Sequence, residues 1–166
     1  MNTPSKALFQ ETQRFTQWWM WFFALIPLGI GLYGSYVQFH LGVPFGNKPM
    51  SDTGLLVFVA FGVFFAGFLG MHQLTTKVTS TALTVHFYPY TRREVAWEEV
   101  DEWSLIPYDF VGGWGVRLWT KYGTVYNVKS GMGLYITLKN KKRFLVSTQQ
   151  PQALQYAVGE ALSRSV

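Results

Sequence analysis

The side chains best suited to bind a metal ion or to move protons are three histidines. His40 and His72 each follow a long apolar segment, and His86 lies on the polar side of an alternating stretch. If the apolar segments form a helical hairpin in a membrane, His40 and His72 lie at opposite faces and cannot share a metal ion. The chain has no cysteine, which removes thiolate ligands and nucleophiles. We therefore predict no catalytic residue, no metal site and no cofactor.

Two other segments could take part in chemistry but have simpler explanations. Carboxylates could hold a cation or act as acid and base, and four of them lie close together at Glu98, Glu99, Asp101 and Glu102. No histidine lies nearby in the sequence to shift the pKa values of these carboxylates. We interpret this run as a solvated strand-to-turn edge. The glycine-rich stretch 112–115 lacks the following helix that a nucleotide loop needs, so we expect a hairpin turn.

Aromatic and basic residues are the remaining candidates for binding. Trp114, Tyr108 and Phe110 form either a surface for a partner protein or part of the core. Basic residues gather at Lys139, Lys141, Lys142 and Arg143, and again at Arg92 and Arg93. They are either solvated turn charges or contacts to anionic lipid headgroups, each worth about 1 kcal/mol near a membrane surface. Nucleic acid is a weaker alternative, because no helix suited to reading bases is visible.

The elements that carry these residues begin with two long uncharged segments. Residues 18–39 and 53–72 contain no Asp, Glu, Lys or Arg. A helix needs about 20 apolar residues to cross a bilayer, so we predict two transmembrane helices. They leave an N-terminal tail at 1–17 and a short loop at 40–52. A signal peptide does not explain the first segment, which is too long and lacks a cleavage site.

The distribution of charge predicts the orientation of this hairpin. Two crossings put both termini on one side of the membrane. Basic residues are concentrated after the second helix, beginning with Lys77, whereas the loop at 40–52 carries about equal charge of both signs. The positive-inside rule then places both termini in the cytoplasm.

Small residues recur at intervals of four in both segments. Gly62, Ala66 and Gly70 form one series, and Gly31 and Ser35 belong to the other. Such residues let helices approach closely in lipid. Either the two helices pack on each other, or the series forms the seam of a homo-oligomer.

The sequence pattern of residues 74–166 is typical of a separate β domain. Apolar side chains take every second position at 83–87 and 134–138, as in half-buried strands. Further strands are expected at 74–79, 93–97, 103–109, 115–120, 124–128 and 143–148, separated by turn residues. A helix follows from Pro151, with Leu154, Ala157, Val158, Ala161 and Leu162 on one face and a Glu160–Arg164 pair on another. We expect about seven antiparallel strands, eight at most, capped by this helix.

This order of elements resembles a pleckstrin-homology-like (PH-like) fold. More narrowly, the chain resembles bacterial membrane proteins in which a two-helix hairpin precedes a PH-like domain. The resemblance is carried by short motifs at 95–100 (VAWEEV), 112–117 (GGWGVR), 133–138 (GLYITL) and 142–151 (KRFLVSTQQP). The clustered basic residues of phosphoinositide-binding PH domains are not matched, since only Lys77 and His86 lie in the corresponding stretch.

The resemblance implies architecture and a bacterial inner-membrane location more than an activity. We expect a membrane-tethered, non-enzymatic scaffold at the cytoplasmic face, with the bilayer, anionic lipids or an unidentified protein as partner. The alternative is a homo-oligomeric assembly or an accessory subunit of a membrane complex.

Overall fold

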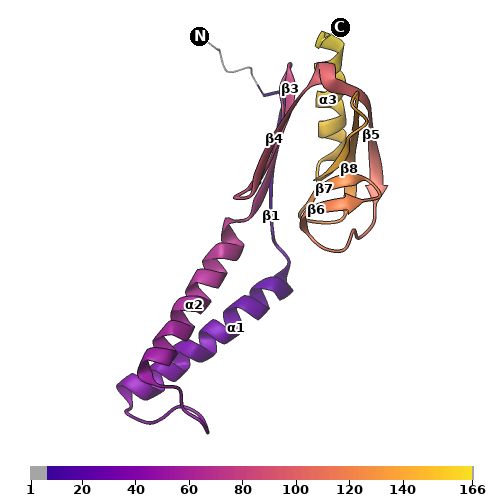
Figure 1. The fold of residues 1–166 in the computed structure, drawn as a ribbon. Helices are drawn as coiled ribbons and strands as arrows, with labels where there is room; N and C mark the ends of the chain where they lie inside the picture. The colour runs from indigo at the N-terminus through magenta and orange to yellow at the C-terminus, as the bar shows by residue number, and fades with distance from the viewer. Residues whose placement is uncertain (1–6, 166) are drawn as a thin grey trace. The chain divides into compact units, whose positions relative to one another are not determined.

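The computed structural model describes residues 7–165, and the side chains of 7–164. The described chain divides into two compact units (Figure 1). One unit is the helical segment from Thr16 to Met71. The other joins the residues up to Phe15 with those from His72 onward.

The helical unit contains the two predicted apolar helices. Helix α1 (Trp18–Ser35) continues as a π-helical segment, η1 (Tyr36–His40), and helix α2 (Asp52–Met71) follows the loop. Both spans, of 23 and 20 residues, are long and apolar enough to cross a membrane. The prediction of two such helices is confirmed.

Small residues bring α1 and α2 together. A Cβ placed on Gly62 would lie 3.1 Å from Leu28 Cδ1, and one on Gly31 would lie 2.9 Å from Phe58 Cδ1. Both glycines are buried. Because a larger side chain has no room at either point, these glycines set how closely the helices approach.

The second unit begins with a four-stranded antiparallel sheet. Its strands lie in the order β1-β2-β3-β4. They are β1 (Phe9–Arg14), β2 (Gln73–Val78), β3 (Ala82–Tyr88) and β4 (Thr91–Ala96). Strand β1 pairs with β2 although the whole helical unit separates them in the sequence.

Strand β1 corrects the expectation of a polar tail at 1–17. Its inward positions are Phe9, Glu11 and Gln13, and all three are buried. Only one of these side chains is apolar, so the alternation that marks a strand is missing from the sequence. Residues 1–6 of the predicted tail lie outside the described residues.

The second sheet has five strands in the order β5-β8-β9-β7-β6. They are β5 (Val100–Tyr108), β6 (Gly115–Thr120), β7 (Gly123–Asn127), β8 (Gly131–Leu138) and β9 (Arg143–Thr148). Strands β7 and β9 are parallel, whereas the other neighbours are antiparallel. The described residues thus form nine strands, and the predictions of about seven strands, and of antiparallel pairing throughout, are wrong.

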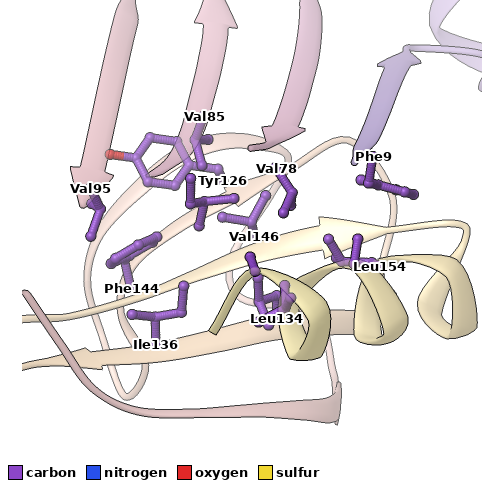
Figure 2. Packing of buried hydrophobic residues seen from close by; sticks show 14 of the residues in the cluster. Phe9, Val78, Val85, Val95, Tyr126, Leu134, Ile136, Phe144, Val146 and Leu154 are labelled. Atoms are coloured by element: carbon purple, nitrogen blue, oxygen red, sulfur yellow. The ribbon is translucent and has the colours of Figure 1, made fainter. Parts of the chain in front are cut away.

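Apolar side chains of the two sheets meet in one core. Figure 2 shows Val78, Val85 and Val95 on one side and Leu134 and Ile136 on the other. The apolar residues predicted to alternate at 83–87 and 134–138 all lie in this core, on β3 and β8. Burial of this apolar surface is the main force that holds the sheets together.

Helix α3 (Pro151–Ser165) completes the core, as predicted. Its apolar stripe of Leu154, Ala157, Val158 and Ala161 is buried in the same cluster. The predicted pair also forms, with Arg164 Nη2 2.5 Å from Glu160 Oε1. Between β4 and β5 a short 3-10 turn, η2 (Trp97–Glu99), buries Trp97, whose indole nitrogen donates to Thr79 O at 2.9 Å.

Candidate functional site

The basic residues predicted to contact lipid lie beside the acidic run. Lys139, Lys141, Lys142 and Arg143 are all exposed around the turn between β8 and β9. The backbone nitrogen of Lys139 donates to Glu99 O at 2.9 Å, which places this turn against η2. Lys141 Nζ lies 2.9 Å from Asp101 Oδ2. The Asp101 carboxylate offsets the charge of Lys141, one of the four basic residues that an anionic surface would attract.

The same pair changes the ionisation of Lys141. A hydrogen bond to Asp101, followed by the charge of that carboxylate, raises the pKa of the ammonium group. Lys141 therefore stays protonated and is engaged within the domain.

Arg92 and Arg93 on β4 have different surroundings. Arg92 Nη2 lies 3.6 Å from Glu94 Oε2, and both side chains are exposed. The guanidinium carbon of Arg93 lies 4.2 Å from the ring centre of Phe144, a cation–π contact with the core. Arg93 is thus partly used in packing, and Arg92 is the more accessible charge.

The three predicted contact aromatics do not form one surface. Tyr108 is only 4 % exposed, and its hydroxyl donates to Lys129 O at 2.6 Å. Such a buried ring offers no area to a partner, which corrects its assignment as a contact residue. Phe110 is exposed and packs edge-to-face on Trp114, with ring centres 5.7 Å apart.

Each of the three histidines contacts an aromatic ring. His40 stacks on Tyr36 in η1, and His86 lies edge-on to Tyr88. His72 Nε2 lies 2.7 Å from the hydroxyl oxygen of Tyr90. Within residues 7–165, no group of three or more His, Asp or Glu side chains could hold a metal ion.

The predicted packing residues of the helices are used within the chain. Gly31 and Gly62 pack against the facing helix, as described above. Ser35 Oγ donates to Gly31 O at 2.8 Å within its own helix. Ala66 is partly buried, and Gly70 lies near Trp21. The packing of the two helices on each other accounts for the burial of Gly31 and Gly62.

A groove that the sequence did not predict runs between β5 and the outer face of α3. It is open and mostly apolar, with a volume of about 650 Å³. The lining residues are Trp103 on β5 and Gln152, Gln155, Tyr156, Gly159, Glu160 and Ser163 on α3. None of them is Lys or Arg, and the one charged member, Glu160, is paired with Arg164.

Two signals in the sequence could have pointed to this groove. Tyr156 interrupts the polar face of the predicted helix, and the structure leaves it 83 % exposed. Gly159 lies on the same face, one turn away, and leaves a depression there. The position of Trp103 beside this face depends on strand order, which periodicity does not reveal.

Strand β5, which contributes Trp103 to the groove, is also an edge strand of the second sheet. Strand β5 pairs with β8 on one side, and no other strand of the described chain pairs with its outer edge. An unpaired edge carries free backbone donors and acceptors that can bind an extended segment.

Exposed apolar side chains also lie at the end of β6, next to the turn into β7. Trp119 is 95 % exposed, and Leu118 beside it is 54 % exposed. The sequence predicts a strand at 115–120 and no role for these two residues.

A comparison with family models, curated proteins and solved structures found no significant match to this chain.

Proposed function

We propose that the chain is a non-enzymatic binding module that two transmembrane helices hold at the cytoplasmic face of the bacterial inner membrane. Its ligand is a segment of a partner protein. The observation that carries the proposal is the apolar groove between β5 and α3.

The surface of the helical unit supports membrane attachment. Large apolar side chains are exposed along both helices, among them Phe23, Ile30, Phe61 and Phe64. A 20-residue helix is about 30 Å long, which matches the hydrocarbon core. These side chains are unfavourable in water and favourable among acyl chains.

The two-helix arrangement supports a multi-pass topology with both termini on one side. Lys and Arg residues outnumber acidic residues after α2, which favours the cytoplasm for that side. The four-stranded sheet, the second sheet and the C-terminal helix are compatible with a PH-like domain. Strands β6 and β7 form an antiparallel hairpin, and the parallel pairing of β7 with β9 joins this hairpin to the second sheet.

The chemistry of the groove favours a protein segment over a lipid headgroup. Trp103 and Tyr156 provide apolar area, and glutamine side chains at 152 and 155 provide neutral hydrogen-bonding groups. No basic side chain lines the groove to neutralise a phosphate. An extended segment with an apolar anchor residue could fill the groove and pair with the edge of β5.

A substitution at Gly159 tests this proposal without disturbing the core. A Cβ at Gly159 meets nothing within 4 Å, and replacing a helical glycine favours the helix by about 1 kcal/mol. Gly159→Arg therefore fills the groove while the domain stays folded. The control is Ala153→Arg, at an exposed position of α3 outside the groove.

The readout is the set of proteins that co-purify with the full chain from native membranes. We expect at least one to be retained by the wild type and by Ala153→Arg but reduced about tenfold by Gly159→Arg, a loss of about 1.4 kcal/mol. An identical set with Gly159→Arg would contradict the groove as the binding site. Removal of the wild-type chain from membranes by alkaline carbonate would contradict the anchoring.

A further inference from the structure

Strand β6 holds a tryptophan with an unfavourable backbone conformation next to the turn into β7. Trp119 has a φ of +56°, in the left-handed region that side chains with a Cβ rarely adopt. Of the large apolar residues in the described chain, it is the most exposed, at 95 %. Burial within the domain therefore does not explain a bulky aromatic residue here.

The strand register explains how the turn presents this residue. Arg117 pairs with Val125, and Thr120 pairs with Gly123. Leu118 and Trp119 on β6 therefore face the single residue Thr124 on β7, which is the arrangement of a β-bulge. Both apolar side chains are exposed beside the turn.

Hydrogen bonds hold the turn in this form. Thr120 Oγ1 donates to Gly123 O at 2.9 Å and accepts from the backbone nitrogen of Tyr122 at 3.1 Å. Gly123 has a φ of +82°, and a Cβ there would overlap the carbonyl oxygen of Arg143 on β9. The exposed pair is thus carried by a well-defined turn that is fixed to the second sheet.

The charges around the turn are of one sign. Residues 114–131 include Arg117, Lys121 and Lys129 and contain no Asp or Glu. Lys121 is exposed beside the apolar pair, with its ammonium nitrogen 4.9 Å from the ring centre of Tyr122. The sequence around this turn thus carries no carboxylate, whereas in the turn between β8 and β9 Lys141 is paired with Asp101.

We propose that Leu118 and Trp119 insert into the interface of an anionic bilayer, with Lys121 contacting the headgroups. Tryptophan prefers the headgroup region, and basic side chains beside it are attracted to anionic lipids. A narrow turn with two apolar side chains suits shallow insertion, whereas a stable protein interface buries about 1,600 Å². This inference rests on the proposed membrane attachment and adds a second contact between the chain and the bilayer.

The absence of cysteine allows a direct measurement of depth. A nitroxide label on Leu118→Cys in the full chain reports the end of β6, and a label on Ala153→Cys serves as an exposed control on α3 outside the groove. The chain is reconstituted in vesicles of phosphatidylcholine and phosphatidylglycerol. Collisions of each label with oxygen, which concentrates in the bilayer, and with a water-soluble nickel chelate are then measured.

We expect the label at 118 to collide with the nickel chelate at least about threefold less often than the label at 153, and more often with oxygen. Adding Trp119→Ser to the 118 label, or omitting phosphatidylglycerol, should return its collision rates toward those at 153. If both labels collide equally often with the nickel chelate while the chain resists carbonate extraction, the insertion of Leu118 and Trp119 is contradicted and the proposed attachment is not. Protection at 118 from both quenchers would indicate a protein contact and would also overturn it. Extraction by carbonate would instead contradict the proposed attachment.

Discussion

Glu11 and Gln13 take inward positions on β1 that strands usually give to apolar side chains. Glu11 accepts hydrogen bonds from Thr148 Oγ1 at 2.7 Å and from the backbone nitrogen of Gln149 at 2.8 Å. Gln13 Nε2 donates to Ser147 O at 2.6 Å. These bonds fix the N-terminal strand to the end of β9, and they satisfy polar groups whose burial would otherwise destabilise the fold.

Removing the Glu11 carboxylate should therefore weaken the domain. Glu11→Ala leaves the hydroxyl of Thr148 and the amide of Gln149 without their acceptor, and we expect a loss of about 2 kcal/mol in the free energy of unfolding. Denaturant unfolding of the full chain in detergent measures this loss. Gln10→Ala, at an exposed position on the same strand, is the control. Equal stability of the two variants would contradict the described role of β1.

Tyr108 should make the domain sensitive to alkaline pH. Burial raises the pKa of its hydroxyl above the ordinary value of 10.0, despite opposing hydrogen bonds from Ser147 and Asn127. The stability contributed by the neutral hydroxyl is complete below pH 10.0 and is lost as the pH rises through the raised pKa.

Tyr108→Phe separates this effect from the ionisation of other groups. Near pH 8 the variant should be less stable by about 1 kcal/mol, because the bond to Lys129 O is missing. This difference should shrink, or reverse, above pH 10. Free energies of unfolding of both chains at several pH values test the prediction, and a difference that does not change with pH would contradict it.

At the scale of elements, the spacing of α1 and α2 depends on glycines that differ in their surroundings. Gly62 faces Leu28 closely, whereas a Cβ on Gly67 meets nothing within 4 Å. We expect Gly62→Leu to destabilise the helical hairpin by about 1–3 kcal/mol, as overpacking does, and Gly67→Leu to have little effect. Thermal unfolding of both variants in detergent makes the comparison. A larger effect at Gly67 would indicate that this face packs against another molecule.

Most elements could be predicted from the sequence, because their inward residues are apolar at regular intervals. All eight expected strands and all three helices form within a few residues of their predicted bounds. Strand β1 was not predicted, because the polar residues Glu11 and Gln13 occupy its inward positions. The parallel pairing of β7 with β9 depends on contacts between distant segments, which local patterns do not encode.

The candidate binding surfaces were harder to predict than the elements. The basic residues at 139–143 form a run in the sequence, but their acidic neighbours come from another strand. The groove likewise joins Trp103 of β5 to a face of α3. Only the tertiary arrangement shows which charges are offset and which aromatic side chains are exposed.

At the scale of the whole molecule, the β domain is built from two separate parts of the sequence. Strand β1 precedes the helical unit, and the rest of the domain follows it. The chain leaves the domain after β1, passes through both helices and returns at β2. If the helices cross a bilayer, both connections must be on the same side. The pairing of β1 with β2 thus supports an even number of crossings independently of charge.

The most direct test of the account is the side of the membrane on which each unit lies. Two single-cysteine variants are made, Lys48→Cys in the loop and Ala153→Cys on α3. Each is treated with a membrane-impermeant maleimide in sealed vesicles of both orientations. Two crossings with the domain in the cytoplasm predict labelling of residue 153 only in inside-out vesicles and of residue 48 only in right-side-out vesicles. Labelling of both positions from the same side would contradict the two crossings.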